Sequence, residues 1–263
     1  GEWMSSHELM DASVQERLHR LEEQVRSDKV MVAFVAEFSR GKSELINAIF
    51  FADYGRRIMP ASAGRTTMCP TELGYDAAVA PSLRLLPIET RLHVQSLAEW
   101  RLKTDRWLEI PLEIGNADQM AKAVEKVSEI RKVSLEEARA LGFWHDDLSE
   151  ENPLPDAHGL VEVPMWRHAL INIPHPLLKQ GLVILDTPGL NAVGAEPELT
   201  VNLIPQAHAV VFILSADTGV TRSDLSIWRE HLAIPLDGID ARLVVLNKID
   251  TLWDTLNTAE QVQ

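Results

Sequence analysis

The chain has 263 residues, of which 46% are hydrophobic and 24% charged, as in an ordinary soluble globular protein. Its formal net charge of −14 argues against a wide nucleic-acid footprint and against direct contact with anionic lipid, although local basic patches stay open. No apolar run reaches transmembrane length, no signal peptide is predicted, and the single cysteine, Cys69, excludes an internal disulfide. We therefore expect a cytoplasmic protein with no nucleic-acid partner.

A helix is predicted from about Ser5 to Lys29. Val14, Leu18, Leu21 and Val25 recur at spacings of four, three and four residues and form a narrow apolar stripe. This helix either packs on its own domain or binds partners outside this chain, and the sequence leaves both alternatives open.

The pattern of residues 30–50 predicts a buried strand, a tight loop and an amphipathic helix. The apolar run Val30–Val35 precedes Ala36–Ser43, whose Gly-Lys-Ser end is the core of a P-loop. Backbone N–H groups and the helix dipole would bind a polyphosphate, Lys42 would add a positive charge, and the Ser43 hydroxyl would ligate Mg²⁺. The motif asks for glycine at position 36, where an alanine fits if its φ is negative. The predicted nucleotide-binding residues here are Glu37, Phe38, Ser39, Arg40, Gly41, Lys42, Ser43 and Glu44.

The segment Phe51–Met68 is rich in Gly, Pro, Ser and Arg, which is typical of a loop. Its position after the P-loop is where a first switch would fall, with a threonine that closes on Mg²⁺ and on the γ-phosphate. Thr67, three residues before Pro70, is preferred for this role over Thr66 and Thr71.

Strands are predicted near Thr71–Tyr75 and Ser82–Pro87, after which the chain changes character. Residues 89–166 exceed what a minimal P-loop nucleotide-binding fold needs at this point, so we expect an inserted, mainly helical subdomain. Its helices are predicted near 94–103, 117–130 and 134–141, and its packing from Trp100, Trp107, Trp144 and Trp166. A metal site at His145, Asp146 and Asp147 is weighed against a solvated acidic turn, which is favoured.

Two further motifs follow apolar strands. Gly181–Gly189 ends in Asp-x-x-Gly, where Asp186 would hold a magnesium-bound water and the Gly189 amide would sense the γ-phosphate. Leu243–Asp250 ends in Asn-Lys-x-Asp, whose carboxylate can accept from the N1–H and exocyclic amine of guanine. Adenine has its donor elsewhere, so this motif predicts GTP rather than ATP. The residues assigned to the nucleotide here are Asp186, Gly189, Asn247, Lys248 and Asp250.

The remaining elements complete a nucleotide-binding fold. Strands are predicted at Leu170–Ile173 and Ala209–Leu214, a second switch at Leu190–Leu199, and helices at Val201–Ala207, Ser223–Leu232 and from about Asp254. A complete domain of this type would add a strand, a base-closing loop and a final helix, so we expect the chain to be truncated.

Hydrolysis needs an oriented water and charge neutralisation at the γ-phosphate. The residue after Asp-x-x-Gly is Leu190, whose side chain cannot orient water, so intrinsic turnover should be slow or the water must be placed by other groups. Additional positive charge could come from Arg40 or from a monovalent cation near Ser39, while a solvent-facing Arg40 is the plainer alternative. The predicted catalytic residues are Lys42, Thr67, Ser39 and Arg40, with Ser43, Thr67 and Asp186 at the metal.

The segments Glu37–Ala48, Thr67–Glu72 and Leu185–Leu190 resemble the bacterial dynamin-like GTPases of the dynamin superfamily. The resemblance implies Thr67 as the switch threonine, Asp186 at the magnesium site, and a K⁺ or Na⁺ site involving Ser39 that forms when two GTPase domains dimerise. It also implies membrane remodelling in the full-length protein through regions absent from this chain, and a neck role for the 5–29 helix. Phe38 departs from the glutamine of eukaryotic dynamins.

The predicted architecture is an α/β P-loop GTPase fold with a mostly parallel central sheet flanked by helices. Residues 30–88 and 167–263 would form the GTPase domain, 89–166 the insertion and 5–29 a neck-like helix. GTP or GDP and Mg²⁺ are the expected ligands, and the location is cytoplasmic or peripheral to the inner face of the membrane. Two alternatives stay open: an Era-like regulatory switch linked to RNA or the ribosome, and a nucleotide-dependent interaction module with little turnover.

Overall fold

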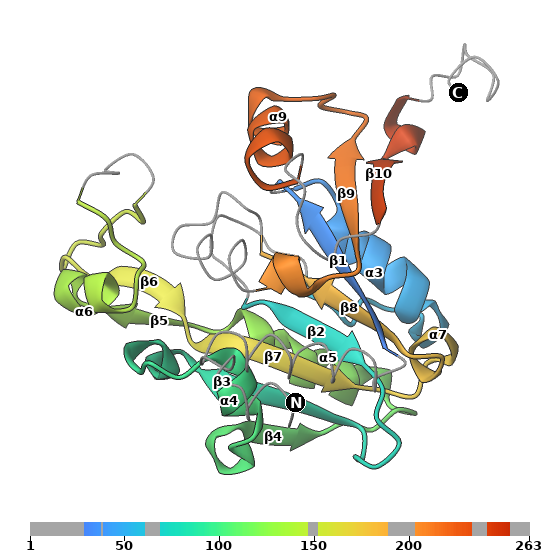
Figure 1. Cartoon of the computed structure of the whole chain (residues 1–263), viewed down its shortest axis with the longest axis horizontal. Helices are drawn as coiled ribbons and strands as arrows, with labels where there is room; N and C mark the ends of the chain where they lie inside the picture. Colours follow the sequence, from blue (N-terminus) through green and yellow to red (C-terminus); the bar gives the residue numbers. More distant parts are fainter. Residues whose placement is uncertain are drawn as a thin grey trace, which may run out of the picture.

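A mixed β-sheet runs through the described part of the chain, with its strands in the order β10-β9-β1-β8-β2-β7-β3-β4 (Figure 1). The computed structural model describes residues 29–37, 39–60, 69–146, 152–188, 203–232 and 241–252. The strands of this sheet are β1 Val30–Ala36, β2 Thr71–Gly74, β3 Ser82–Pro87, β4 Leu108–Pro111, β7 Trp166–Asn172, β8 Leu182–Asp186, β9 Ala209–Ser215 and β10 Ala241–Asn247. Strands β5 Ile130–Val133 and β6 Val161–Pro164 pair separately.

The half of the sheet around β1 is parallel. Strand β1 pairs in parallel with β8 and β9, and β9 pairs in parallel with β10. Ala33, Val35 and Ala36 have no exposed surface, as expected for a strand covered on both faces. Because the four strands are parallel, their carboxyl ends meet at one edge of the sheet, and this edge receives the three motifs predicted from the sequence.

The other half of the sheet is mixed. Strand β2 runs antiparallel to β8 and parallel to β7, and β3 runs antiparallel to both β7 and β4. The register places Thr71, the first residue of β2, opposite Asp186, the last residue of β8. Strand β2, which follows the predicted first switch in the sequence, therefore begins beside the end of β8.

Helices cover both faces of the sheet (Figure 1). They are α3 Lys42–Phe50, α4 Leu97–Arg101, α5 Ala117–Val124, α6 Leu135–Ala140, α7 Pro176–Lys179 and α9 Arg222–Ile227. Successive side chains of a strand point to opposite faces, and accordingly Phe34 and Ala36 belong to one apolar cluster while Ala33 and Val35 belong to another. The first cluster contains residues of α3, α5 and α7, and the second contains residues of α4 and α9.

Segment 89–166 differs from the expected separate subdomain. Its predicted helices exist as the shorter α4, α5 and α6, but β4 within it pairs with β3 and extends the central sheet. The predicted packing role of Trp100, Trp107 and Trp166 is correct, yet all three lie in the two main clusters and not in a core of the segment's own. Sequence reasoning missed β4, although Leu108 and Ile110 alternate with Glu109, because the strand has only four residues and contains a proline, Pro111.

The part of the segment with its own packing is the β5–β6 pair with α6. A third apolar cluster there includes Val133, Ala138 and Val163, and Trp144 packs against it. In Figure 1 this unit lies at the far end of the molecule from β10.

Several helices are shorter than predicted, and others fall outside the described residues. The Ser223–Leu232 helix is α9 followed by a π-helical turn, Trp228–Leu232. The described part of the predicted Val201–Ala207 helix, residues 203–207, contains a 3-10 turn at Ile204–Gln206. Residues 5–28 of the predicted first helix, the second switch 190–199 and the helix from Asp254 lie outside the described residues. Within the described residues, no helix is both long and apolar enough to cross a membrane.

Candidate functional site

The loop between β1 and α3 has an unusual backbone. Ser39 and Gly41 both have left-handed φ angles, +65° and +82°, on either side of Arg40. Turns of this kind point successive N–H groups into one concavity, which suits an anion. Gly41 is also sterically required, because a Cβ at this position would lie 2.5 Å from the Asn247 side-chain nitrogen. Helix α3 begins immediately after Gly41, at Lys42.

Lys42 and Asp186 meet at the carboxyl edge of the sheet. The Lys42 ammonium donates to Asp186 Oδ1, and the two side chains are only 10% and 4% exposed. The strand ends behind them are joined by Thr187, whose hydroxyl donates to the Phe34 carbonyl over 2.8 Å. The structure thus brings together two residues that are 144 positions apart and that were assigned to one site from separate motifs.

The third motif joins the same loop from β10. Asn247 Nδ2 donates to the carbonyls of Arg40, at 3.0 Å, and Gly41, at 3.4 Å. Lys248 follows with a left-handed φ of +56°, and Asp250 is exposed in the 3-10 turn Ile249–Leu252. The predicted base-recognition motif and the P-loop are therefore in direct contact through Asn247.

Arg40 is held by acceptors inside the protein. Its guanidinium is not solvent-facing, since Arg40 is 5% exposed and binds Asp224 over 2.8 Å and Thr221 over 3.2 Å. It also donates to Glu37 and to Thr218. The pairing follows from the chain path, because the segment after β9 passes beside the P-loop and offers two hydroxyls, of Thr218 and Thr221, and the Asp224 carboxylate.

A turn after β9 contributes residues that the motif search missed. Asp217 accepts from Lys248 Nζ at 3.0 Å and from the buried Ser215 hydroxyl. Hydrogen bonds from Ser215 and Lys248 lower the pKa of Asp217 to about 2. The nearby Thr221 and Asp224 form a capping box at the start of α9. Their Thr-x-x-Asp spacing is visible in the sequence and could have marked this helix start.

Other predicted residues lie apart from this cluster or outside the described chain. Glu44 is on the outer surface of α3, where its carboxylate pairs with Arg57 over 2.6 Å. Phe38, Thr67 and Gly189 are outside the described residues. Thr71 is buried in β2 and donates its hydroxyl to the Cys69 carbonyl, which leaves Thr66 and Thr67 as the switch candidates.

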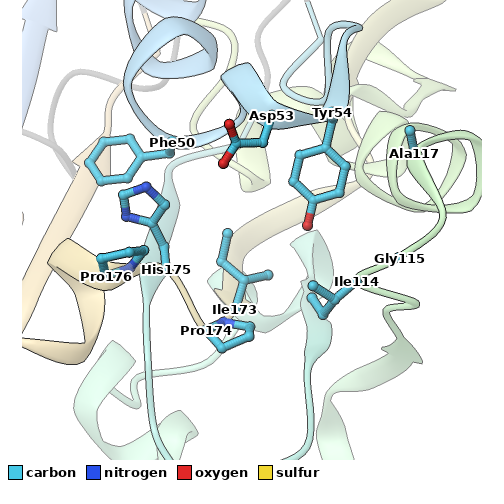
Figure 2. A pocket seen from close by; sticks show the side chains of 10 residues that line it. All are labelled: Phe50, Asp53, Tyr54, Ile114, Gly115, Ala117, Ile173, Pro174, His175 and Pro176. Atoms are coloured by element: carbon cyan, nitrogen blue, oxygen red, sulfur yellow. The ribbon is translucent and has the colours of Figure 1, made fainter.

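A cavity of about 460 Å³ lies at the opposite end of α3 (Figure 2). Phe50, the last residue of the helix, packs edge-to-face on His175, with ring centroids 5.1 Å apart. Burial lowers the pKa of His175. Asp53, Tyr54 and apolar residues complete the wall, and none of the predicted nucleotide-binding residues lines it. The phosphate site and this cavity are therefore separate features.

A parallel sheet with a left-handed loop, a buried lysine and a carboxylate at its carboxyl edge defines a P-loop nucleotide-binding protein. The dynamin family model matches residues 32–249, which is most of the chain. The chain therefore belongs to the dynamin family, and the dynamin-like resemblance of its motifs is confirmed. Membership implies a guanine-nucleotide-binding domain.

Two solved structures also match the chain, and both come from work on "an oligomerised bacterial dynamin pair" that concerns the long-range sensing and tethering of membranes. They are 19% and 17% identical to this chain, each with a TM-score of 0.46. The matches cover 89% and 96% of this chain but only 28% and 37% of those proteins, so this chain spans about a third of their length. No curated protein sequence matches the chain.

Proposed function

We propose that this chain binds GTP at the β1–α3 loop and hydrolyses it to GDP and phosphate. The observation that carries the proposal is the convergence at the β1–α3 loop of Lys42, at the start of α3, Asp186, at the end of β8, and Asn247, at the end of β10. Dynamin-family membership supports the same reading.

The phosphate side of the site rests on the loop backbone and Lys42. The left-handed residues Ser39 and Gly41 shape the concavity, and the first turn of α3 adds the positive end of its dipole. Lys42 now donates to Asp186, so an entering phosphate would compete with that carboxylate for the ammonium. The exchange would keep Lys42 paired before and after binding, which avoids leaving a buried charge alone.

Mg²⁺ fits the residues that surround this pair. Asp186 is a buried carboxylate at the strand end, and Ser43 lies beside Lys42 on the first turn of α3. Carboxylate and hydroxyl oxygens are ligands that Mg²⁺ prefers, with the remaining positions taken by phosphate and water. We assign Ser43, Asp186 and the predicted switch residue Thr67 to the metal, which would neutralise charge on the phosphates.

The guanine side would be formed by the end of β10. Asp250 is exposed and can accept from the guanine N1–H and amine, while Lys248 is positioned by Asp217. Asn247 holds this segment to the phosphate loop through the Arg40 and Gly41 carbonyls. The phosphates and the base of a GTP molecule would therefore be bound by residues that contact each other.

Of the groups that hydrolysis needs, the one that orients the attacking water is the least well supplied by this chain, because the Leu190 side chain cannot donate or accept a hydrogen bond. We propose that Thr67 and the switch backbone place the water, and that K⁺ or Na⁺ near Ser39 adds positive charge when two domains dimerise. In the full-length protein, this nucleotide-dependent dimerisation would drive membrane remodelling.

The test is GTP hydrolysis measured against protein concentration, first in potassium and then in a large organic cation. Specific activity that rises with concentration and falls without potassium is the expected result. Thr67→Ala should abolish turnover while Thr66→Ala, its neighbour of identical chemistry, should retain it. GTP turnover that does not depend on protein concentration, on the cation or on Thr67 would contradict the dimer-dependent mechanism.

Nucleotide binding is tested separately by titrating a fluorescent GDP analogue into the protein. Lys42→Met should weaken binding at least tenfold, as expected for the loss of a charge-assisted phosphate contact. Binding by the parent without any turnover would instead favour the nucleotide-dependent interaction module.

A further inference from the structure

The contacts around Arg40 close a ring between three segments of the chain. Its backbone carbonyl accepts from Asn247, and its guanidinium donates to Thr218 in the turn after β9. Asp217 of the same turn binds Lys248, which is the neighbour of Asn247. The P-loop, the turn and the guanine-recognition segment are thus bonded in a circle, with Arg40 contributing two of the bonds.

Buried side chains hold this ring to helix α9. Arg40 and Asp224 are 5% and 1% exposed, and Asp224 also fixes the start of α9 through its bond to the Thr221 amide, 2.9 Å long. A guanidinium held by several acceptors in a planar fork has little freedom to move. Arg40 therefore holds the turn, and through Asp217 the turn fixes the side chain of Lys248.

We propose that Arg40 is a positioning residue for guanine recognition. It joins the phosphate-binding loop to the turn that orients Lys248, so that the phosphate and base ends of the site keep a fixed separation. The inference rests on the proposed function, since it concerns recognition of the same nucleotide. This role differs from the added positive charge considered for Arg40, and it rests on the bonds of the guanidinium to Asp224 and Thr221 at the start of α9.

The experiment measures affinities for GDP and ADP by competition against a fluorescent GDP analogue, using the parent protein and variants. Arg40→Ala is expected to weaken GDP binding at least tenfold and to reduce the preference for GDP over ADP by a similar factor. Arg40→Lys should recover part of both, because it restores the charge without the fork. Arg139→Ala is the matched control: its guanidinium pairs with Asp146 over 2.8 Å at the surface of the β5–β6 unit, and both affinities should be unchanged.

Thr218→Val supplies the test if Arg40→Ala does not fold. Thr218 is exposed, so the exchange removes one bond of the ring and little packing, and the preference for GDP should fall severalfold. A lower melting temperature with an unchanged GDP-to-ADP ratio in these variants would overturn the inference and leave the proposed function intact. A parent protein that binds no guanine nucleotide would overturn both.

Discussion

Gly41 occupies a position where both backbone conformation and space exclude a side chain. Gly41→Ala would hold alanine at a φ of +82° and place its Cβ 2.5 Å from the Asn247 side chain. The left-handed conformation alone costs roughly 1–2 kcal/mol, and Asn247 must also move. We expect a larger loss of stability than this strain alone, and at least tenfold weaker GDP binding, measured by urea unfolding and by titration.

Gly55→Ala is the control for that substitution. Gly55 has a φ of +65° but no atom within 4 Å of the Cβ that it would gain, so it carries the strain without the collision. Equal effects of the two substitutions on stability and on GDP affinity would show that the contact with Asn247 has no consequence.

Glu72 provides a test of a buried ion pair. Burial by itself would raise the pKa of Glu72, but Arg101 and His168 overcome this effect and lower it from 4.5 to about 2. A carboxyl whose pKa is lower in the folded state contributes stability above pH 4.5, and that contribution is lost as the pH falls toward 2. A difference of this size corresponds to about 3 kcal/mol.

We therefore expect Glu72→Gln to destabilise the protein at neutral pH, and the gap from the parent to narrow between pH 4.5 and pH 2. Urea unfolding across this range measures the gap. Asp105→Asn is the control, because Asp105 pairs with Arg106 at the surface, where both side chains are mostly exposed. A gap that stays constant with pH would mean that the Glu72 charge does not contribute.

At the scale of elements, the end of β8 is attached to β1 by Thr187. Its hydroxyl donates to the Phe34 carbonyl over 2.8 Å, and the side chain has no exposed surface. Thr187→Val keeps the shape and leaves that carbonyl without this donor, which costs about 1–3 kcal/mol. Because Asp186 is the neighbouring residue, we expect weaker nucleotide binding as well as lower stability, measured by titration and by thermal unfolding.

Thr90→Val separates these two effects. The Thr90 hydroxyl donates to the Pro87 carbonyl over 2.7 Å and is also largely buried, but it follows β3, which lies three strands away from β8 in the sheet. The Thr90→Val substitution should lower stability to a similar extent as Thr187→Val, with no change in GDP affinity. If both variants bound GDP equally well, Thr187 would have only a structural role.

At the scale of the whole molecule, nucleotide binding should stabilise one part of the fold more than another. A ligand at a hundred times its dissociation constant stabilises the native state by about 2.7 kcal/mol. We expect GDP to slow amide hydrogen exchange in the β1–α3 loop, at the end of β8 and in the 216–221 turn. Exchange in β5, β6 and α6 should not change, since these elements pack in a cluster of their own. ADP at the same concentration is the control, and equal protection by both nucleotides would contradict guanine specificity.

The elements that sequence reasoning placed best are those with long apolar runs. Strand β3 was predicted at Ser82–Pro87 and has those bounds, and β1 differs by one residue. Burial on both faces of a parallel sheet requires continuous apolar residues, so the requirement can be read locally. Strand β4 lies at the exposed edge of the sheet, so its residues need not be continuously apolar, and the strand was not predicted.

In the candidate site, too, some residues carry a local sequence signal and others do not. The residues at the ends of β1, β8 and β10 could be assigned because each motif is a short segment whose chemistry is complete in itself. Arg40 could not be assigned, since its partner Asp224 is 184 positions away and nothing near either residue marks the pair. The cavity beside Phe50 had no local signal either, because its walls come from three separate parts of the chain.

The sequence by itself determined the class of fold and the dynamin-like family, and it predicted the motif residues of a nucleotide site. Local periodicity and short motifs carry this information, because strand burial and phosphate binding depend on adjacent residues. The tertiary structure decided which side chains meet: Lys42 with Asp186, Arg40 with Asp224, and Glu72 with His168. These pairs join groups that are 144, 184 and 96 positions apart, and only the packing of the sheet brings them within bonding distance.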